Sequence, residues 1–289
     1  MPMHVLVAGA GWLGSAVARE LAAGGHRVTA VRRDPSRASG LNSLGVNVLG
    51  LDLAAPASAE RLPRDLDAVV ACQSSSADSP EAYRRAYLEA NRTLLDAVRA
   101  SGRPVAFVYT GSTGVFGQRD GGEVDEETEP MPASQAAEVL CEAERLVREA
   151  AAPGLRSLVL RLSGLYGPGR NWLVERVRGG QMALGPGDGA WLNLLHRDDA
   201  VAAVLAALER GGAGRVYHAT DAEPVRRREL IRWVAERLGI PVPERPEGAP
   251  STRLADRRIL GDRSRAELGI ELRHPTFREG LVFPETSNA

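Results

Sequence analysis

Three glycines near the N-terminus have a spacing that suits pyrophosphate binding. The segment AGAGWLG places Gly9, Gly11 and Gly14 as G-x-G-x-x-G, directly after an apolar run and before a stretch with helical spacing. The first glycine permits a tight turn, the second lets backbone N–H groups approach a phosphate, and the third lets helix and strand pack closely. The helix N-terminus at Trp12 and Leu13 adds the positive end of its dipole. The pattern predicts a dinucleotide-binding loop.

Basic residues occupy the end of the next apolar run, where such a site distinguishes its two cofactors. Arg32 and Arg33 close the segment HRVTAVRR, and Arg37 follows. NAD sites generally present a carboxylate here to the ribose hydroxyls. Guanidinium groups instead suit a 2′-phosphate, which they bind through bidentate hydrogen bonds. Because arginines also commonly follow strands on protein surfaces, the pattern favours NADP and leaves NAD open.

Four further side chains could take part in catalysis, and each has a structural alternative. Ser112 and Thr113 end the apolar segment PVAFVYTGS, where hydroxyls can bond to a substrate or cap a turn. Tyr166 could offer a phenol from the opposite wall of a cleft, or serve only in packing. His196 titrates in the range used for proton transfer, but a histidine before a helix-capping aspartate is often a structural hydrogen-bonding residue.

Other polar and aromatic residues are weaker candidates. The acidic stretch EVDEETE (123–129) could supply a carboxylate base, although charged runs on loops are usually solvated. Arg170, Asn171 and Trp172, together with Trp191, could line an anionic or ring-shaped substrate. The chain has 5 His and 2 Cys without metal-binding spacing, so we expect no metal site.

Alternating strands and helices must position these residues. Apolar segments predict strands over 4–11, 26–33, 46–53, 67–73, 104–112 and 156–167. Amphipathic segments predict helices over 12–25, 81–102 and 134–150. Such alternation with short connections predicts an α/β fold, a Rossmann-type doubly wound parallel sheet.

The regular alternation of predicted strands and helices changes beyond Gly167, which suggests a second part of the molecule. A strand with a capped helix follows over 193–208, then a short strand over 215–220 and an amphipathic helix over 225–240. We predict a dinucleotide-binding domain over residues 1–165 and about 191–220. A smaller mixed α/β C-terminal lobe over 166–190 and 221–289 would bind the substrate.

Composition excludes several classes of partner. The 289 residues carry a net charge of -1, which gives no reason to expect nucleic acid or an anionic membrane as a partner. No apolar run is long enough to cross a bilayer, and the N-terminus lacks a signal-peptide pattern. Two cysteines give no disulfide framework and favour a cytoplasmic location. The chain contains no lysine.

These segments together resemble the extended short-chain dehydrogenases/reductases, close to the NAD-dependent epimerase/dehydratase family. Besides the glycine loop, the similar blocks are LDL (51–53), YTGSTGVFG (109–117), RLSGLYGPGR (161–170), NLLHRDDAVAAVLAAL (193–208) and SRAELGIELRHPTFREGL (264–281). The usual glycine spacing is G-x-x-G-x-x-G, so this chain looks like a member of an atypical subgroup. The resemblance implies that Asp52 contacts the adenine, and we place Leu53 and Ser74 in the same cofactor site.

The resemblance also reveals a missing pair. In that family a serine orients the substrate, and a Tyr-x-x-x-Lys pair transfers the proton. Ser112 falls on the serine position, but counting back from Glu144 places Ala136 and Leu140 at the tyrosine and the lysine. A phenol activated by an ammonium group therefore cannot operate here.

Two function classes follow from this combination. The first is an NAD(P)-dependent oxidoreductase, epimerase or isomerase that acts on a polar small molecule, such as a nucleotide sugar, without the usual pair. The second is a catalytically silent NADP(H)-binding sensor or regulatory protein. Proteins similar to this family form dimers through helices equivalent to 81–100 and 134–150, which makes a homodimer an expectation by analogy.

Overall fold

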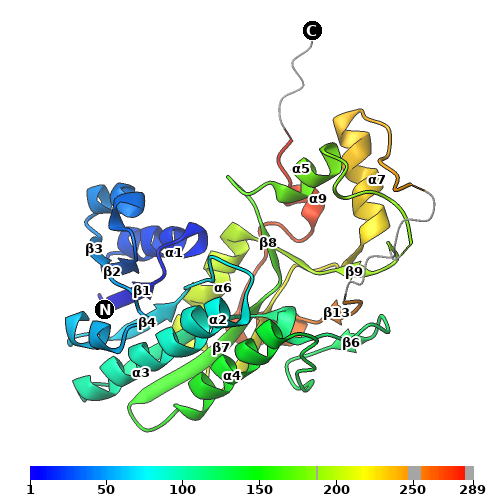
Figure 1. Cartoon of the computed structure of the whole chain (residues 1–289). Coiled ribbons are helices and arrows are strands. Elements are labelled where there is room, and N and C mark those ends of the chain that lie inside the picture. Colours follow the sequence, from blue (N-terminus) through cyan, green and yellow to red (C-terminus); the bar gives the residue numbers. More distant parts are fainter. Residues whose placement is uncertain (187, 247–254, 284–289) are drawn as a thin grey trace.

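A seven-stranded parallel sheet forms the centre of the molecule. The computed structural model describes residues 1–186, 188–246 and 255–283 (Figure 1). In spatial order the strands are β11 (Val216–Ala219), β7 (Leu155–Leu162), β5 (Val105–Ser112), β4 (Ala68–Ala71), β1 (His4–Ala8), β2 (Arg27–Arg32) and β3 (Asn47–Gly50). The chain starts near the middle and winds first to one edge and then to the other. This confirms the predicted doubly wound sheet, whose ligands bind at the carboxyl ends of the strands beside the reversal between β1 and β4.

Helices cover both faces because the strands are apolar on both faces. In β1, Val5 and Val7 belong to one buried cluster, while Leu6 and Ala8 belong to another. The first cluster includes α1 (Trp12–Ala23) and α6 (Arg197–Arg210); the second includes α3 (Ala90–Ser101) and α4 (Gln135–Glu149). Figure 1 shows α3 and α4 side by side on one face. This double cover explains why the strands read as continuous apolar runs in the sequence.

Two predicted elements are subdivided in the structure. The helix predicted over 81–102 consists of α2 (Pro80–Tyr83), a π-helical stretch (Arg84–Glu89) and α3. The strand predicted over 156–167 ends at Leu162, and β8 (Gly164–Tyr166) then pairs in parallel with β10 (Leu194–His196). The change of partner occurs at Ser163 and Gly164, whose N–H groups donate to the carbonyls of Ala219 and Asn193. Periodicity could not show this break because both pieces are apolar.

Short elements connect the strands of the main sheet. Three 3₁₀ segments cover Pro35–Leu44, Pro56–Arg61 and Thr113–Val115. Besides β8 with β10, two further small pairs of strands lie outside the main sheet among the described residues. They are the parallel pair β6 (Glu123–Val124) with β13 (Arg258–Ile259) and the antiparallel pair β9 (Trp191–Leu192) with β12 (Val225–Arg226).

A separate apolar cluster supports the C-terminal elements. It joins α5 (Trp172–Arg178), α7 (Arg227–Leu238) and α9 (Phe277–Gly280), which group at one end of the molecule in Figure 1. In contrast, α8 (Asp262–Leu268) contacts α6 and β11 of the main sheet, although we predicted it in the second lobe. Parts of that predicted lobe, at 187, 247–254 and 284–289, lie outside the described residues. The exact domain boundaries stay a prediction.

The helices of the described residues include none that combines the length and hydropathy needed to cross a membrane.

Candidate functional site

The glycine loop leads from β1 into α1 through a tight turn. Gly9 has a φ of +90°, in the left-handed region that glycine tolerates. A Cβ on Gly9 would lie 2.5 Å from the backbone nitrogen of Gln73, and a Cβ on Gly14 would lie 2.2 Å from the carbonyl oxygen of Gly9. Around Gly11 the nearest such atom is 3.9 Å away, so space remains beside the backbone there. Packing thus requires glycine at positions 9 and 14, whereas Gly11 leaves room for a ligand.

A cavity of about 580 Å³ opens beside this loop. It lies at the carboxyl ends of β1, β2 and β4, at the point where the strand order reverses. Seven predicted cofactor-binding residues line it: Gly9, Gly11, Arg32, Arg33, Asp52, Leu53 and Ser74. Trp12, Leu13 and Gly14 belong to the adjoining first turn of α1 and are not part of the lining. The volume and position suit an extended dinucleotide.

Guanidinium groups dominate one end of the cavity. Arg33 and Arg37 are exposed, and Arg32 Nη1 donates to the carbonyl oxygen of Ala10 at 2.8 Å. That bond joins the end of β2 to the glycine loop. The carboxylate of Asp52 accepts a hydrogen bond from Arg85 Nη2 at 2.8 Å. Sequence reasoning identified Arg32, Arg33 and Asp52 but missed Arg85, because it comes from the distant π-helical stretch.

A carboxylate also lies at this end, on Asp34. Its Oδ1 accepts from the hydroxyl of Ser36 at 2.6 Å and from the backbone N–H of Ser36 at 3.1 Å. The side-chain hydrogen bond from Ser36 is the main cause that lowers the pKa of Asp34. Since its acceptor capacity already serves the start of the 3₁₀ segment Pro35–Leu44, Asp34 acts mainly as a cap.

Trp12 connects the glycine loop to the loop that follows β8. Its Nε1 donates to the carbonyl oxygen of Pro168 at 2.9 Å. The guanidinium groups of Arg170 and Arg197 lie 5.4 and 5.5 Å from the ring centroid. Cations at this distance are attracted to an indole ring. Arg170, predicted only as a residue near the substrate, therefore lies at the first turn of α1.

The strand-end hydroxyls take different roles. Ser112 Oγ accepts from the N–H of Gly114 at 3.0 Å, so it caps the turn, and the described residues offer no acceptor for its own proton. Thr113 is buried, and its Oγ1 lies 3.4 Å from the carbonyl oxygen of Leu162. Both roles weighed for Ser112 are thus compatible, whereas Thr113 is directed into the protein.

Tyr166 is enclosed rather than directed into the cavity. It is fully buried, and its hydroxyl donates to the carbonyl oxygen of Thr276 at 3.3 Å. Burial, more than the nearby carboxylates Asp221 and Asp199, raises the pKa of Tyr166 above its usual range. A phenol in this position is poorly placed to donate a proton to a ligand of the main cavity, so these contacts fit the structural alternative.

His196 caps α6 and belongs to a buried polar group. Its Nδ1 accepts from the N–H of Asp198 at 3.2 Å, and its ring stacks on His274 with centroids 3.6 Å apart. Burial, followed by the charge of His274, lowers the pKa of His196. His196, Asp199 and His274 are close enough to bind a metal ion together. However, the oxygens of Asp199 already accept from the N–H groups of Arg273 and His274 at 2.7 and 3.0 Å, which indicates a structural group.

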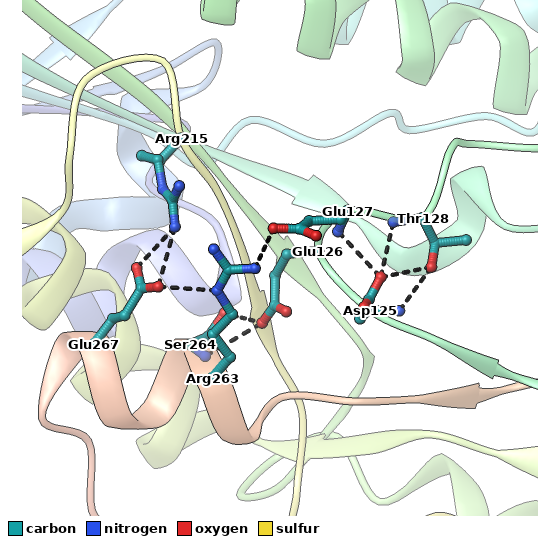
Figure 2. Close-up of polar contacts among 8 residues, drawn as sticks. All are labelled: Asp125, Glu126, Glu127, Thr128, Arg215, Arg263, Ser264 and Glu267. Atoms are coloured by element: carbon teal, nitrogen blue, oxygen red, sulfur yellow. Dashed lines mark hydrogen bonds and ion pairs between the residues drawn. The ribbon is translucent and has the colours of Figure 1, made fainter.

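The acidic loop 123–129 binds another part of the protein. Figure 2 shows Glu126 and Glu127 of this loop directed toward Ser264 and Arg263 of α8, whereas Asp125 is turned toward Thr128. Glu126 accepts from the N–H and hydroxyl of Ser264, and Glu127 forms an ion pair with Arg263 at 2.5 Å. Asp125 accepts backbone N–H groups within the loop itself. These contacts hold the loop on α8 and leave little support for a catalytic base there.

Helix α4 presents apolar side chains at the two positions of interest. Its sequence, QAAEVLCEAERLVRE, contains neither tyrosine nor lysine. Leu140 is buried in a cluster with Val115, Phe116, Val124 and Ile259. The only buried charge in the helix is Glu144, whose carboxylate accepts from Arg161 Nη2 at 2.8 Å and from Nε at 2.9 Å. That pair joins α4 to β7, and Arg161 Nη1 has no hydrogen-bond partner among the described residues.

Comparisons with known proteins agree with this architecture. A Streptomyces protein named 3-diazoavenalumate denitrifying reductase is 32% identical, over 96% of this chain and 99% of that protein. The 2-alkyl-3-oxoalkanoate reductase of Stenotrophomonas maltophilia is 31% identical, over 83% of this chain and 77% of that protein. The solved structure of MoeE5 with UDP-glucose and NAD matches at 26% identity and a TM-score of 0.79, over 96% of each chain.

The match to a family as a whole is equally broad. The NAD dependent epimerase/dehydratase family matches residues 5–219, which include the glycine loop, every strand of the main sheet and α4. This confirms the resemblance inferred from the sequence blocks. The chain belongs to the NAD-dependent epimerase/dehydratase family.

Proposed function

We propose that this protein is an NADP(H)-dependent reductase that acts on a small organic carboxylate without a tyrosine–lysine pair. The observation that carries the proposal is the combination of two features. The glycine loop and the cavity beside it have the form of a dinucleotide site, whereas α4 has neither the tyrosine nor the lysine that transfers the proton in the family's usual mechanism. Bound NADPH would supply a hydride, and the reaction would then proceed without a tyrosine as proton donor.

The arginines at the end of β2 support the choice of NADP. Arg33 and Arg37 are exposed at the edge of the cavity, where a 2′-phosphate could accept from both. Arg32 has a second role, because its guanidinium also donates a hydrogen bond to the carbonyl of Ala10. Asp34, the carboxylate nearest in sequence, is occupied by Ser36. The arginines at this end of the cavity outnumber the carboxylates of Asp34 and Asp52, which favours a phosphate over ribose hydroxyls.

The missing proton donor favours reduction of a group that needs no proton. Reduction of a ketone requires a proton for the new alkoxide, and epimerisation through a keto intermediate requires a base as well. Replacement of a diazonium group by hydride releases N₂ and forms a C–H bond. It requires neither a proton donor nor a base. The name of the Streptomyces relative denotes such a diazo compound. We therefore favour a diazonium carboxylate as the substrate class.

The carboxylate is suggested by both reductase relatives. Their names denote a 3-diazoavenalumate and a 2-alkyl-3-oxoalkanoate, and each is the anion of an organic acid. By contrast, nucleotide sugars are named for MoeE5, which is less similar in sequence. In this arrangement Ser112, at the end of β5, would orient the substrate by a hydrogen bond rather than by proton transfer.

Isotope transfer tests this function directly. The purified chain is mixed with NADPH and a cinnamate that carries a ring diazonium group, and the rate is compared with the same mixture without protein. We expect faster NADPH oxidation, with deuterium from 4-deuterated NADPH on the ring carbon. A 3-oxo acid, and UDP-glucose with NADP⁺, should react far more slowly.

Two results would contradict the proposal in different ways. Turnover of UDP-glucose would show an epimerase or dehydrogenase. Saturable NADPH binding without turnover of any substrate would instead favour the silent sensor. The variant Gly11→Ala is a matched control, because a Cβ there meets no protein atom closer than 3.9 Å and would intrude only on a bound phosphate.

A further inference from the structure

Arg257 reaches from the C-terminal part of the chain to the strand-end motif. It directly precedes β13, and its Nη2 donates to the carbonyl oxygen of Thr113 at 2.8 Å. Thr113 immediately follows β5, so this guanidinium lies at the carboxyl end of a central strand, next to Ser112. Ligands of doubly wound sheets bind at this edge. Sequence analysis did not select Arg257.

The guanidinium of Arg257 is charged, half-buried and incompletely satisfied. Its Nε is buried and has no hydrogen-bond partner among the described residues. Nor does any described carboxylate lie within 4.0 Å of it, whereas the neighbouring Arg258 pairs with Glu123 at 3.2 Å. Burial is the main cause that lowers the pKa of Arg257. The charge of Asp256 opposes this desolvation only in part, since Asp256 forms no ion pair with Arg257 within 4.0 Å, and an anionic ligand would offset the remaining cost.

Nearby residues hold Arg257 in place through its backbone. Asn193 Nδ2 donates to the carbonyl of Arg257 at 3.0 Å, and Asn193 Oδ1 accepts from the N–H of Ile259 at 2.7 Å. On the other side, the N–H of Asp256 donates to the carbonyl of Gln118, and that of Arg258 to Gly122, each at 2.8 Å. The segment is fixed from two directions, so the side chain is preorganised for a ligand.

Other donors without acceptors lie on the same segments. The indole Nε1 of Trp191 and the Nε of Arg258 are buried and have no partner among the described residues. Trp191 is joined to this region because its N–H donates to Asp256 Oδ1 at 2.9 Å. Arg226 covers the indole ring at 3.8 Å from the centroid. Buried donors normally have partners, so the unpartnered donors on these adjoining segments indicate missing acceptors.

We propose that Arg257 binds the carboxylate of the substrate and so determines specificity for organic acids. This inference rests on the reductase function proposed above and names the group that recognises its substrate. Arg257 offers its Nε edge to the ligand while Nη2 stays on Thr113. The carboxylate would thereby be held at the end of β5, beside the Ser112 hydroxyl. Trp191 and Arg226 would border the site on the side of β9 and β12.

The alternative is that Arg257 only ties the C-terminal segment to Thr113. That contact uses Nη2 and does not explain why the Nε lacks a hydrogen-bond partner. The two roles differ in a measurable way, because a purely structural link has no reason to distinguish an acid from its amide. Paired ligands that differ only in this charge therefore separate the two roles.

Calorimetric binding to the chain saturated with NADP⁺ provides the test. The probes are cinnamate with cinnamamide and benzoate with benzamide. We expect each acid to bind at least about tenfold more tightly than its amide. Arg257→Gln should weaken binding of the acids by about thirtyfold or more and leave the amides unchanged. Arg257→Lys, which keeps the charge, should restore part of the preference.

Arg103→Gln is the matched control. Arg103 pairs with Asp67 at 3.1 Å and lies just before β5, at the opposite edge of the sheet, so it should bind the probes like the original chain. Thermal denaturation of each variant with NADP⁺ verifies the fold. The inference is overturned if no acid binds, if the amides bind equally well, or if Arg257→Gln weakens both classes alike. Acid binding with the expected preference but no NADPH turnover would retain the carboxylate site and reject the reductase.

Discussion

The indole N–H of Trp12 donates to the carbonyl oxygen of Pro168 at 2.9 Å, and this bond joins the glycine loop to the loop after β8. Arg170 and Arg197 flank the same ring. The first turn of α1 is therefore held by the loop after β8 and by Arg197. Because the N–H groups of this turn are the ones that would bind a pyrophosphate, their position depends on Trp12.

Trp12→Phe tests this dependence. Phenylalanine preserves an aromatic ring for the two arginines and removes the donor to Pro168. One neutral hydrogen bond contributes about 1 kcal/mol, so NADPH affinity should fall by at most about fivefold. Fluorescence titration of NADPH measures it. Unchanged affinity would show that the loop holds its position without this bond.

The glycines of the loop should respond differently to the same substitution. Gly14→Ala places a Cβ 2.2 Å from a backbone oxygen, so the loop must shift, and both the melting temperature and NADPH affinity should fall. Gly11→Ala meets no such obstacle, so the melting temperature should change little while NADPH affinity falls. Differential scanning fluorimetry with and without NADPH separates the two effects. Equal loss of stability in both variants would refute this assignment.

Arg33 is the cleanest position at which to test cofactor preference. Its guanidinium is exposed and lines the cavity, and unlike Arg32 it makes no hydrogen bond to the glycine loop among the described residues. Arg33→Ser should lower NADPH affinity about tenfold or more and leave NADH affinity nearly unchanged, since only the former carries a 2′-phosphate. Arg103→Ser serves as a distant control. A parallel decrease for both cofactors would contradict a role in specificity.

Tyr166→Phe should be almost neutral for turnover. The variant loses one hydroxyl bond to the carbonyl of Thr276 and keeps the buried ring, which costs about 1 kcal/mol of stability. A proton donor would instead contribute roughly 100-fold or more to kcat. Steady-state kinetics, accompanied by a melting curve, decides between the two. A loss of that size in kcat with an intact fold would reinstate Tyr166 as catalytic.

Acid should destabilise the fold through His218. Burial is the main cause that lowers its pKa from 6.5 to about 4, and its Nδ1 lies 2.9 Å from the carbonyl of Leu260. Because the folded-state pKa is depressed, the stabilisation is present above about pH 6.5 and is lost as the pH falls toward 4. The expected loss is about 3 kcal/mol. Urea denaturation across this range measures it.

His218→Asn is the control for that prediction. The amide nitrogen of asparagine can replace Nδ1 as the donor to Leu260, and asparagine does not titrate. The pH dependence should therefore flatten between pH 6.5 and 4 relative to the original chain. An identical slope in the two proteins would assign the effect to other groups, such as His196.

The cofactor half of the molecule was predictable because its signals are local. Apolar strands, the glycine spacing and Arg32 and Arg33 all lie within short segments, and each segment follows its own periodicity. The parallel sheet and the family were confirmed. The positions of Asp52 and Ser74 in the cavity wall followed from the same regular alternation, because it brings the ends of adjacent strands to one edge.

The substrate side was less predictable because its contacts join distant segments. The strands β6 and β13 contain two residues each, too few to show a period, and they pair across more than a hundred positions. The proposed role of Arg257 depends on that pairing. The same limitation affected the acidic loop, whose charges suggested solvent exposure or catalysis before α8 was placed against it. Likewise, sequence alone could not show that Tyr166 is enclosed by residues near Thr276.

The pairing of β6 with β13 also constrains the order in which the protein can mature during synthesis. The ribosome delivers the glycine loop, the main sheet as far as β7 and the 118–127 loop well before it delivers Asp256, Arg257 and α8. Domains generally begin to fold from the N-terminal side as they emerge. A chain interrupted before residue 255 would thus retain the glycine loop and lack Arg257. Under the proposed function, such copies would bind the dinucleotide but not the substrate carboxylate, because the two proposed binding groups lie far apart in the sequence.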